Sequence, residues 1–455
     1  MDFIEAARLI VGPGQVLTGN DMARFSRDAT GTYASAPLCV LRPGSTDEVA
    51  ALMSLATRHQ QPIVPVSGNT GVSGGTWNDG AAMLSVERMN RVIAVKPEAR
   101  VAIVEAGVIL DTLRGAAEDH GLSFPVIFGA RGSAMIGGIL STNAGGSNVL
   151  RYGNTRAQVL GIEAVLADGR VLNLMGELHK DNSGYDLRDL MIGAEGTLGI
   201  ITKAVVKLAP RPRAYATAMI APASLADGLA LLNRLQEATG GMVEACEYMP
   251  GTYMAKARAR GFPAAFDADH AVNLLVELGG AEGTPAVLEE VLGAAFEEGL
   301  IADAVIAQNE AQRAAMWERR EAAAEIMLTP GPKAMNDIAL PVDAVPLFFD
   351  RMAQLLPSLD AEAHDLSVAH LGDGNIHYVV YCGRDDADHL ALIVEEVDRV
   401  VSELGGSFSA EHGIGLSKRA SMARHKDPVA LDVMRAIKAA LDPAGILNPG
   451  KVLPD

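Results

Sequence analysis

The stretch that decides the fold is Pro65-Val66-Ser67-Gly68-Asn69-Thr70-Gly71-Val72-Ser73-Gly74-Gly75. Its first two residues are the end of a short apolar segment, 63–66. The apolar segment predicts a strand, and the small residues after it predict a loop with exposed peptide N–H groups. Such a loop can form an anion-binding concavity for a pyrophosphate. Its glycine spacing differs from the Rossmann pattern, and no Walker lysine follows. Taken alone, an ordinary glycine-rich turn explains this loop equally well.

Three further glycine-rich stretches follow in the same half of the chain. They are 129–146, Asp181-Asn182-Ser183-Gly184-Tyr185-Asp186-Leu187, and Gly193-Ala194-Glu195-Gly196-Thr197-Leu198-Gly199-Ile200. Between these stretches, apolar segments joined by short turns predict two hairpins, 91–105 and 162–174. Four such loops can wrap one extended ligand with main-chain contacts, so together they indicate a large phosphorylated ligand.

The second half of the chain has a different pattern. Pro210-Arg211-Pro212-Arg213 ends the last apolar segment of the first half and predicts a domain boundary. Beyond it, predicted strands alternate with amphipathic helices, which indicates an α+β domain: an antiparallel sheet with helices on one face. The predicted strands are 242–249, 271–278, 304–308, 337–342, 366–370 and 376–382. We therefore expect a helical lead-in at 1–36, domains at 37–212 and 213–425, and a helical C-terminal segment, 426–455, that returns to the first domain.

Composition excludes several classes of protein. The chain has 455 residues, 49% hydrophobic residues and a formal net charge of −18. That charge argues against nucleic-acid binding, which rests on positive patches. No apolar run approaches the roughly 20 residues of a membrane helix, and the N-terminus lacks the pattern of a secretory signal. The three cysteines are scattered, which suggests a reducing compartment. A cytoplasmic location is expected, with peripheral attachment to a membrane left open.

Histidines are concentrated in one short segment. His370-Leu371-Gly372-Asp373-Gly374-Asn375-Ile376-His377 is followed downstream by Glu411-His412-Gly413. Two imidazoles and a carboxylate can bind a borderline divalent ion and leave a position open for substrate. On a straight strand, positions 370 and 377 would point to opposite faces, so we expect the glycines between them to make a turn that brings them together. The alternative is that each histidine is an ordinary structural residue. Asp373 is expected to form the turn, or else to support an imidazole.

With these motifs in place, the chain resembles the flavoproteins of the vanillyl-alcohol oxidase and p-cresol methylhydroxylase (PCMH) superfamily, and within it the D-2-hydroxy-acid dehydrogenases. The resemblance extends from about residue 37 to Pro454 and includes the ending Asn448-Pro449-Gly450-Lys451-Val452-Leu453. It implies a PCMH-type FAD-binding domain at 37–212. Members that bind flavin covalently have a histidine where this chain has Thr70, so the resemblance implies non-covalent FAD.

The resemblance also implies which residues lie along FAD, although about half of them would be expected only to permit tight turns. They are Ser67, Gly68, Asn69, Thr70, Gly71, Ser73, Gly74, Gly132, Ser133, Gly137, Gly138, Ser141, Thr142, Asn143, Gly145, Ile200, Asn448 and Lys451.

For the second half, the resemblance implies a divalent metal, Zn²⁺ or Mn²⁺, on His370, His377 and Glu411. It further implies that His412 is the base and that Asn375 hydrogen-bonds the substrate. Arg320 would bind the substrate carboxylate, with Lys333 as a second cation; a solvated charge run is the alternative for Arg320. Asp337 is expected to be structural.

The stretches at 68–71 and 179–187 resemble D-2-hydroxyglutarate dehydrogenases most. However, those proteins have a threonine where this chain has Ala324 and a lysine where it has Met335, so D-lactate or another D-2-hydroxy acid is the alternative substrate. The implied electron acceptor is an electron-transfer flavoprotein or a quinone, and the implied oligomer is a homodimer. Two functions of other classes remain: a metallohydrolase and a non-catalytic flavin-binding subunit.

Overall fold

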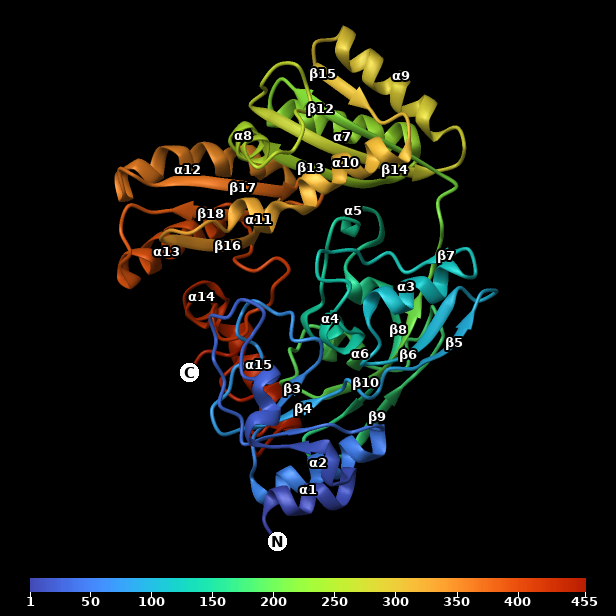
Figure 1. Cartoon of the computed structure of the whole chain (residues 1–455), viewed down its shortest axis with the longest axis vertical. Coiled ribbons are helices and arrows are strands. Elements are labelled where there is room, and N and C mark those ends of the chain that lie inside the picture. The colour runs from blue at the N-terminus through green and yellow to red at the C-terminus, as the bar shows by residue number, and fades with distance from the viewer. The chain divides into compact units, whose positions relative to one another are not determined.

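The computed structural model describes residues 1–455 (Figure 1). The chain divides into two compact units. The first contains residues 1–145, 154–211 and 411–455, and the second contains 146–153 and 212–410. The expected organisation placed the final boundary at 425, whereas here the chain joins the first unit from residue 411 onward. No helix combines the length and the apolar character needed to cross a membrane.

The first unit begins with a four-stranded sheet in the order β1-β2-β4-β3. Its strands are β1 (Val16–Leu17), β2 (Cys39–Leu41), β3 (Ile63–Val66) and β4 (Ala82–Ser85), and its helices are α1 (Phe3–Val11) and α2 (Thr46–His59). The side chain of Ser45 accepts a hydrogen bond from the amide of Glu48, so α2 starts where its capping residues predict. Strand β3 ends at Val66, directly before the first glycine-rich loop. The lead-in is less helical than expected, since α1 is followed by short 3-10 turns, η1 (Pro13–Gln15) and η2 (Gly19–Phe25), and by β1.

A second sheet of the first unit is antiparallel, in the order β5-β6-β10-β8-β9. Its strands are β5 (Val92–Lys96), β6 (Val101–Glu105), β8 (Val159–Val165), β9 (Val171–Leu174) and β10 (Ile200–Lys207). Both predicted hairpins are confirmed as the pairs β5–β6 and β8–β9. The other elements are α3 (Leu110–Glu118), β7 (Leu122–Ser123), α4 (Ile136–Thr142), η3 (Thr155–Gln158), α6 (Leu187–Met191), β11 (Ala209–Pro210), α14 (Arg419–His425) and α15 (Pro428–Leu441).

The second unit is built on a seven-stranded antiparallel sheet in the order β15-β12-β14-β13-β17-β18-β16, as predicted for this half. Its strands are β12 (Ala214–Pro222), β13 (Val243–Pro250), β14 (Val272–Gly280), β15 (Ile301–Ile306), β16 (Lys333–Ala339), β17 (His364–His370) and β18 (Asn375–Tyr381). Strand β12 was missed in the sequence because its apolar face is made of alanines. Strand β16 begins at Lys333, before the start predicted at Asp337.

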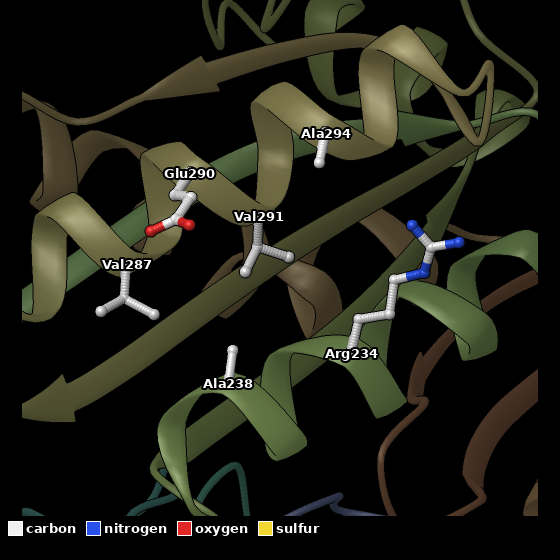
Figure 2. Close-up of a pocket in the computed structure, with 6 residues that line it drawn as sticks. All are labelled: Arg234, Ala238, Val287, Glu290, Val291 and Ala294. Carbon is white, nitrogen blue, oxygen red and sulfur yellow. The ribbon is translucent and has the colours of Figure 1, made fainter.

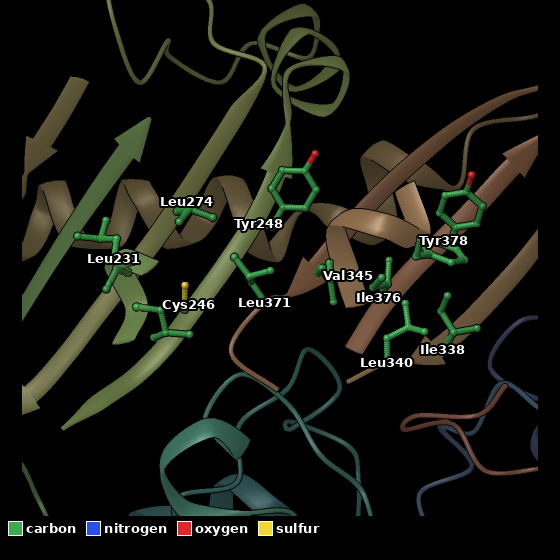
Figure 3. Packing of buried hydrophobic residues seen from close by; sticks show 14 of the residues in the cluster. Leu231, Cys246, Tyr248, Leu274, Ile338, Leu340, Val345, Leu371, Ile376 and Tyr378 are labelled. Atoms are coloured by element: carbon green, nitrogen blue, oxygen red, sulfur yellow. The ribbon is translucent and has the colours of Figure 1, made fainter. Parts of the chain in front are cut away.

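The two faces of this sheet differ. The long helices α7 (Leu225–Thr239), α9 (Thr284–Glu297), α12 (Val345–Leu359) and α13 (Ala387–Glu403) pack on one face and form the larger core. Figure 3 shows part of this core, where Leu231 of α7 lies near the strand residue Leu274 and Val345 of α12 near Ile376. Shorter helices, α8 (Gly251–Ala259), α10 (Glu310–Glu321) and α11 (Ala323–Met327), cover part of the opposite face. The remaining elements are α5 (Val149–Tyr152) and η4 (Val342–Ala344).

The side chains of each strand alternate between the two faces of the sheet. This alternation decides which residues point away from the larger core, toward the shorter helices. In β18, Ile376, Tyr378 and Val380 pack in the larger core, while Val379 and Tyr381 pack under the shorter helices. Successive strand residues point to opposite faces, so His377 lies on the side of Val379 and Tyr381. By the same rule, the polar residues of β13, β16 and β17 that matter below share this face.

Candidate active site

A tight hairpin brings the two predicted metal-binding histidines together. His370 ends β17 and pairs with Asn375, the first residue of β18, so His377 lies two residues farther along on the same face. Their ring centroids are 5.4 Å apart. Asp373 accepts a hydrogen bond from the amide of Asn375 at 3.1 Å, as expected of a turn-forming residue. Gly374 has φ +79°, and a Cβ there would lie 2.0 Å from the Leu340 carbonyl oxygen, so only glycine fits.

Each imidazole has a buried carboxylate at its Nδ1 atom. Glu247 is the cross-strand partner of His370, and its Oε1 lies 2.8 Å from His370 Nδ1. Asp337 is the cross-strand partner of His377, and its Oδ1 lies 3.6 Å from His377 Nδ1. The hydrogen-bonded carboxylate of Glu247 fixes the tautomer of His370 and leaves its Nε2 available to a metal ion, whereas Asp337 lies at ion-pair distance from His377. Asp337 was expected to be structural only; its position against His377 makes it the carboxylate partner of that imidazole.

Arg320 joins this group from helix α10. Its Nε lies 2.8 Å from Oε2 of Glu247. The two residues are 7% and 0% exposed, so the alternative in which Arg320 belongs to a solvated charge run is wrong. Burial by itself would raise the pKa of Glu247, but His370 and Arg320 beside it hold that pKa below its usual value. The Nη2 atom of Arg320 is buried without a hydrogen-bond partner in the protein, so it is available to a ligand.

The other two predicted substrate residues lie in different surroundings. The Nδ2 of Asn375 donates to Asp337 Oδ1 and to the Ile338 carbonyl, both at 3.0 Å, while its buried Oδ1 has no partner. Asn375 can therefore accept a hydrogen bond from a ligand. Lys333 lies four residues from Asp337 along β16, roughly 13 Å at about 3.3 Å per residue. Its ammonium donates to the carbonyls of Thr329 and Gly331, so the structure does not bring it to the histidines.

The predicted ligand set is suited to a single divalent ion. His370 and His377 each offer an imidazole on one face of the sheet in the second unit, and Glu411 and His412 belong to the first unit. Glu411 follows Ala410, whose amide donates to the Asp337 carbonyl at 3.1 Å. The donor set of two imidazoles and one carboxylate is the one that Zn²⁺ and Mn²⁺ accept.

In the first unit, the first glycine-rich loop has the donors that a pyrophosphate needs. None of the peptide N–H groups from Gly68 to Gly75 donates a hydrogen bond to another protein atom, although Ser73 and Gly74 are buried. A Cβ at Gly71 would meet nothing within 4 Å, and one at Gly132 only Asp111 at 3.9 Å, so a ligand can approach both closely. A row of unpaired N–H groups is an anion-binding concavity, which fits a phosphorylated cofactor.

Several of the other predicted FAD contacts shape the loops instead. A Cβ at Gly68 would lie 2.2 Å from the Ser133 carbonyl oxygen, and one at Gly137 would lie 2.9 Å from the Ala106 Cβ. The hydroxyls of Ser141 and Thr142 donate to carbonyls of their own helix. The side chains of Asn69, Asn143 and Asn448 hydrogen-bond to backbone atoms of neighbouring loops.

The remaining predicted FAD contacts lie in several different surroundings. Gly138 packs against Ser67, Gly74 against Tyr33, and Ile200 in the core. Lys451 is buried, with its ammonium 5.5 Å from the Trp77 ring centroid, and its pKa falls to about 8, mainly through burial. Thr70 and Gly145 lie in partly exposed loop segments.

Glu195 is a residue that the sequence analysis did not single out. Its carboxylate accepts hydrogen bonds from the amides of Ile414 at 2.7 Å and Gly415 at 2.8 Å. The Ser73 hydroxyl also donates to the His412 carbonyl at 3.0 Å. The glycine-rich loops therefore fix the segment that carries Glu411 and His412. Burial raises the pKa of Glu195 in spite of these two bonds. The only signal in the sequence was its place in the fourth glycine-rich stretch.

One hollow of the second unit lies elsewhere. It has a volume of about 390 Å³ and lies between α7 and α9, as Figure 2 shows. Its lining residues are Arg234, Ala238, Val287, Glu290, Val291 and Ala294. None of the predicted site residues is among them.

A loop with free peptide N–H groups in one unit and a histidine–carboxylate face in the other fit the class of a cofactor-dependent oxidoreductase. Comparison with known families makes the class specific. Residues 37–175 match the model described as FAD binding domain, and residues 211–452 match the model described as FAD linked oxidases, C-terminal domain. The chain belongs to this family of FAD-linked oxidoreductases, so the predicted FAD-binding domain is confirmed.

Named relatives extend over nearly the whole chain. A D-2-hydroxyglutarate dehydrogenase of Xanthomonas citri pv. viticola is 35% identical, over 95% of this chain and 92% of that protein. A mitochondrial D-2-hydroxyglutarate dehydrogenase of Bos taurus is 36% identical, over 98% of this chain and 82% of that protein. Solved p-cresol methylhydroxylase has the same fold, with a TM-score of 0.76 at 17% identity, over 99% of this chain and 96% of that one. This likeness confirms the predicted fold, and the relatives confirm the predicted resemblance to D-2-hydroxyglutarate dehydrogenases.

Proposed function

We propose that the protein oxidises D-2-hydroxyglutarate to its 2-oxo acid, with FAD as the first electron acceptor. The observation that carries this proposal is the arrangement on one face of the sheet in the second unit. Two imidazoles, each with a carboxylate at Nδ1, lie beside a buried arginine that keeps an unpaired N–H. The relatives that are similar along the whole chain carry the name of this activity.

The chain's own residues account for binding and proton transfer. Arg320 would hold the C1 carboxylate through its unpaired Nη2, because a guanidinium in a buried site binds an anion strongly. Asn375 would accept a hydrogen bond from the substrate through Oδ1. His412 would take the proton of the 2-hydroxyl as the C2–H bond breaks. When bound, FAD supplies the acceptor for the hydride from C2.

His370, His377 and Glu411 would hold a divalent ion, which supplies Lewis acidity that lowers the pKa of the 2-hydroxyl. Glu247 would keep His370 in the tautomer that presents Nε2 to the ion, and Asp337 would place a negative charge beside His377. This leaves His412 to act on a hydroxyl that is easier to deprotonate.

A specific observation favours a shorter substrate as the second candidate. A distal carboxylate needs a cation or hydroxyl, yet Ala324 offers neither, Met335 is an apolar side chain that is 56% exposed, and Lys333 is engaged with two carbonyls. D-lactate, which has no distal carboxylate, would not need these contacts.

An anaerobic screen of purified flavin-loaded enzyme separates these possibilities. We expect D-2-hydroxyglutarate to bleach the flavin absorbance and its L-enantiomer to leave it unchanged. Bleaching by D-lactate alone would transfer the proposal to that substrate. No bleaching by any D-2-hydroxy acid, from a sample with measured zinc or manganese, would refute the reaction. Reoxidation by an electron-transfer flavoprotein or by a quinone analogue then tests the expected acceptor.

A further inference from the structure

A small cavity of about 30 Å³ lies beside helix α8, and neither His370 nor His377 lines it. Its lining includes buried Arg319 and Asn273 and residues 263–266, 268 and 269 of a largely exposed loop. A single water needs roughly 10–15 Å³ measured in this way, so the cavity has room for one small ion or for a few waters. No residue of the proposed reaction lines it.

Arg319 is the unusual feature of this cavity. It is only 4% exposed. One guanidinium nitrogen, Nη2, donates to the Pro263 carbonyl at 2.8 Å, but Nε and Nη1 are buried and have no hydrogen-bond partner. No carboxylate forms an ion pair with Arg319, unlike its neighbour Arg320. Burying a charge is costly unless the charge is paired, so the protein alone leaves this site incomplete.

The other lining groups do not remove the positive charge. Arg258 forms an ion pair with Asp269 at 2.6 Å, so these two cancel each other. Asn273 uses its Nδ2 on the carbonyls of Met249 and His270. The Nε2 of His270 is buried without a hydrogen-bond partner and lies 3.8 Å from Asp303. Counting Arg319 and Arg258 against Asp269 leaves one net positive charge at the cavity.

We infer that this cavity is a binding site for a small monovalent anion of the size of chloride. One negative charge neutralises the surplus, and Nε and Nη1 of Arg319 supply two N–H donors to it. Water would satisfy the donors but would leave the charge unpaired. The volume of about 30 Å³ favours an ion of the size of chloride over a larger oxyanion such as sulfate. The inference does not depend on which hydroxy acid the enzyme oxidises.

The first test is thermal unfolding of the flavin-loaded enzyme in sodium gluconate, with chloride replacing gluconate at constant ionic strength. A ligand that binds only the native state raises Tm in a saturable manner. We expect a rise of roughly 2–4 °C, the effect of a modest binding free energy in a domain of this size. Arg319→Gln should lose this rise, whatever its own Tm. Arg260→Gln, which removes an exposed arginine of the same region paired with Glu325, should retain it.

The second test needs no variant. Crystals of the wild-type enzyme grown without chloride and soaked in sodium bromide should give an anomalous peak within hydrogen-bond distance of the Arg319 guanidinium. A cavity that holds only water would overturn the inference, as would an equal chloride response in Arg319→Gln. A bromide peak without any saturable response in solution would mean an adventitious ion only, and would equally overturn it.

Discussion

Replacing Glu247 with glutamine removes one charge from the centre of the proposed site while keeping the shape of the side chain. Glu247 is fully buried and faces both His370 Nδ1 and Arg320 Nε. A glutamine can accept from one of them, but its amide N–H groups would face a donor on the other side. Arg320 would then be a buried charge without its partner.

The expected size follows from these two losses. Breaking a buried ion pair by removing one partner costs about 3–5 kcal/mol of folding free energy. Losing the carboxylate behind a metal-bound histidine typically lowers metal affinity by roughly 10–100-fold. We therefore expect Glu247→Gln to fold with a lower Tm, to keep its flavin, and to lose zinc or manganese at a chelator concentration that the wild type withstands.

Glu244→Gln is the matched control. Glu244 is a buried carboxylate of the same strand, and it pairs with Arg151 at 2.8 Å and accepts from the Tyr152 hydroxyl. Its replacement should also lower Tm, but it should leave metal affinity unchanged, because it does not touch the histidines. Chelator titration with metal analysis measures the difference. Equal metal affinities for Glu247→Gln and the wild type would refute the role that we give to Glu247.

Three further outcomes are expected. His370→Ala should keep flavin and lose most turnover, measured by flavin content and by an anaerobic rate; undiminished turnover would remove the ion from the reaction. Glu195→Gln should weaken metal binding and slow turnover by roughly tenfold or more, since about 1–3 kcal/mol is lost when an amide faces an unmatched donor; unchanged metal binding would contradict this. Lys451 has its pKa lowered from 10.5 to about 8, so its burial penalty is full below pH 8 and disappears toward pH 10.5. Lys451→Met should therefore raise the Tm of flavin-free protein near pH 7 more than near pH 10, and an equal effect at both would contradict it.

The local signals in the sequence were strong enough to predict the hairpins, the antiparallel sheet and the turn that brings the histidines together. The residues that decide each turn and each single strand are close in sequence, although the order of the strands in the sheet is not decided locally. Gly374, for example, lies within the turn that it permits, and its positive φ is a requirement of that turn alone. Turn chemistry and period-2 alternation are sufficient for such elements.

The partners of the site residues could not be predicted in this way. Glu247 is 123 residues from His370, and Glu195 is 219 residues from Ile414. Only strand order and loop packing bring them together, and no single-sequence pattern encodes either. The same limit applies to Asp337. Its contact with His377 depends on the pairing of β16 with β18, which the sequence of β16 alone does not reveal. The glycine-rich loops show the opposite case. Several of their small residues suggest contacts with a ligand, but they are small because a side chain there would collide with a neighbouring segment.

Arg319 and Arg320 show how much depends on the tertiary partner. They are adjacent on α10, and in the sequence they belong to one charged run, Glu318-Arg319-Arg320-Glu321. Adjacent helical residues point about 100° apart, so the two side chains enter different surroundings. Arg320 meets Glu247, whose pKa is held low, and its charge is compensated within the protein. Arg319 meets only a carbonyl. A buried arginine is therefore paired with a carboxylate of the protein in one case, and in the other we infer that it is paired with an external anion.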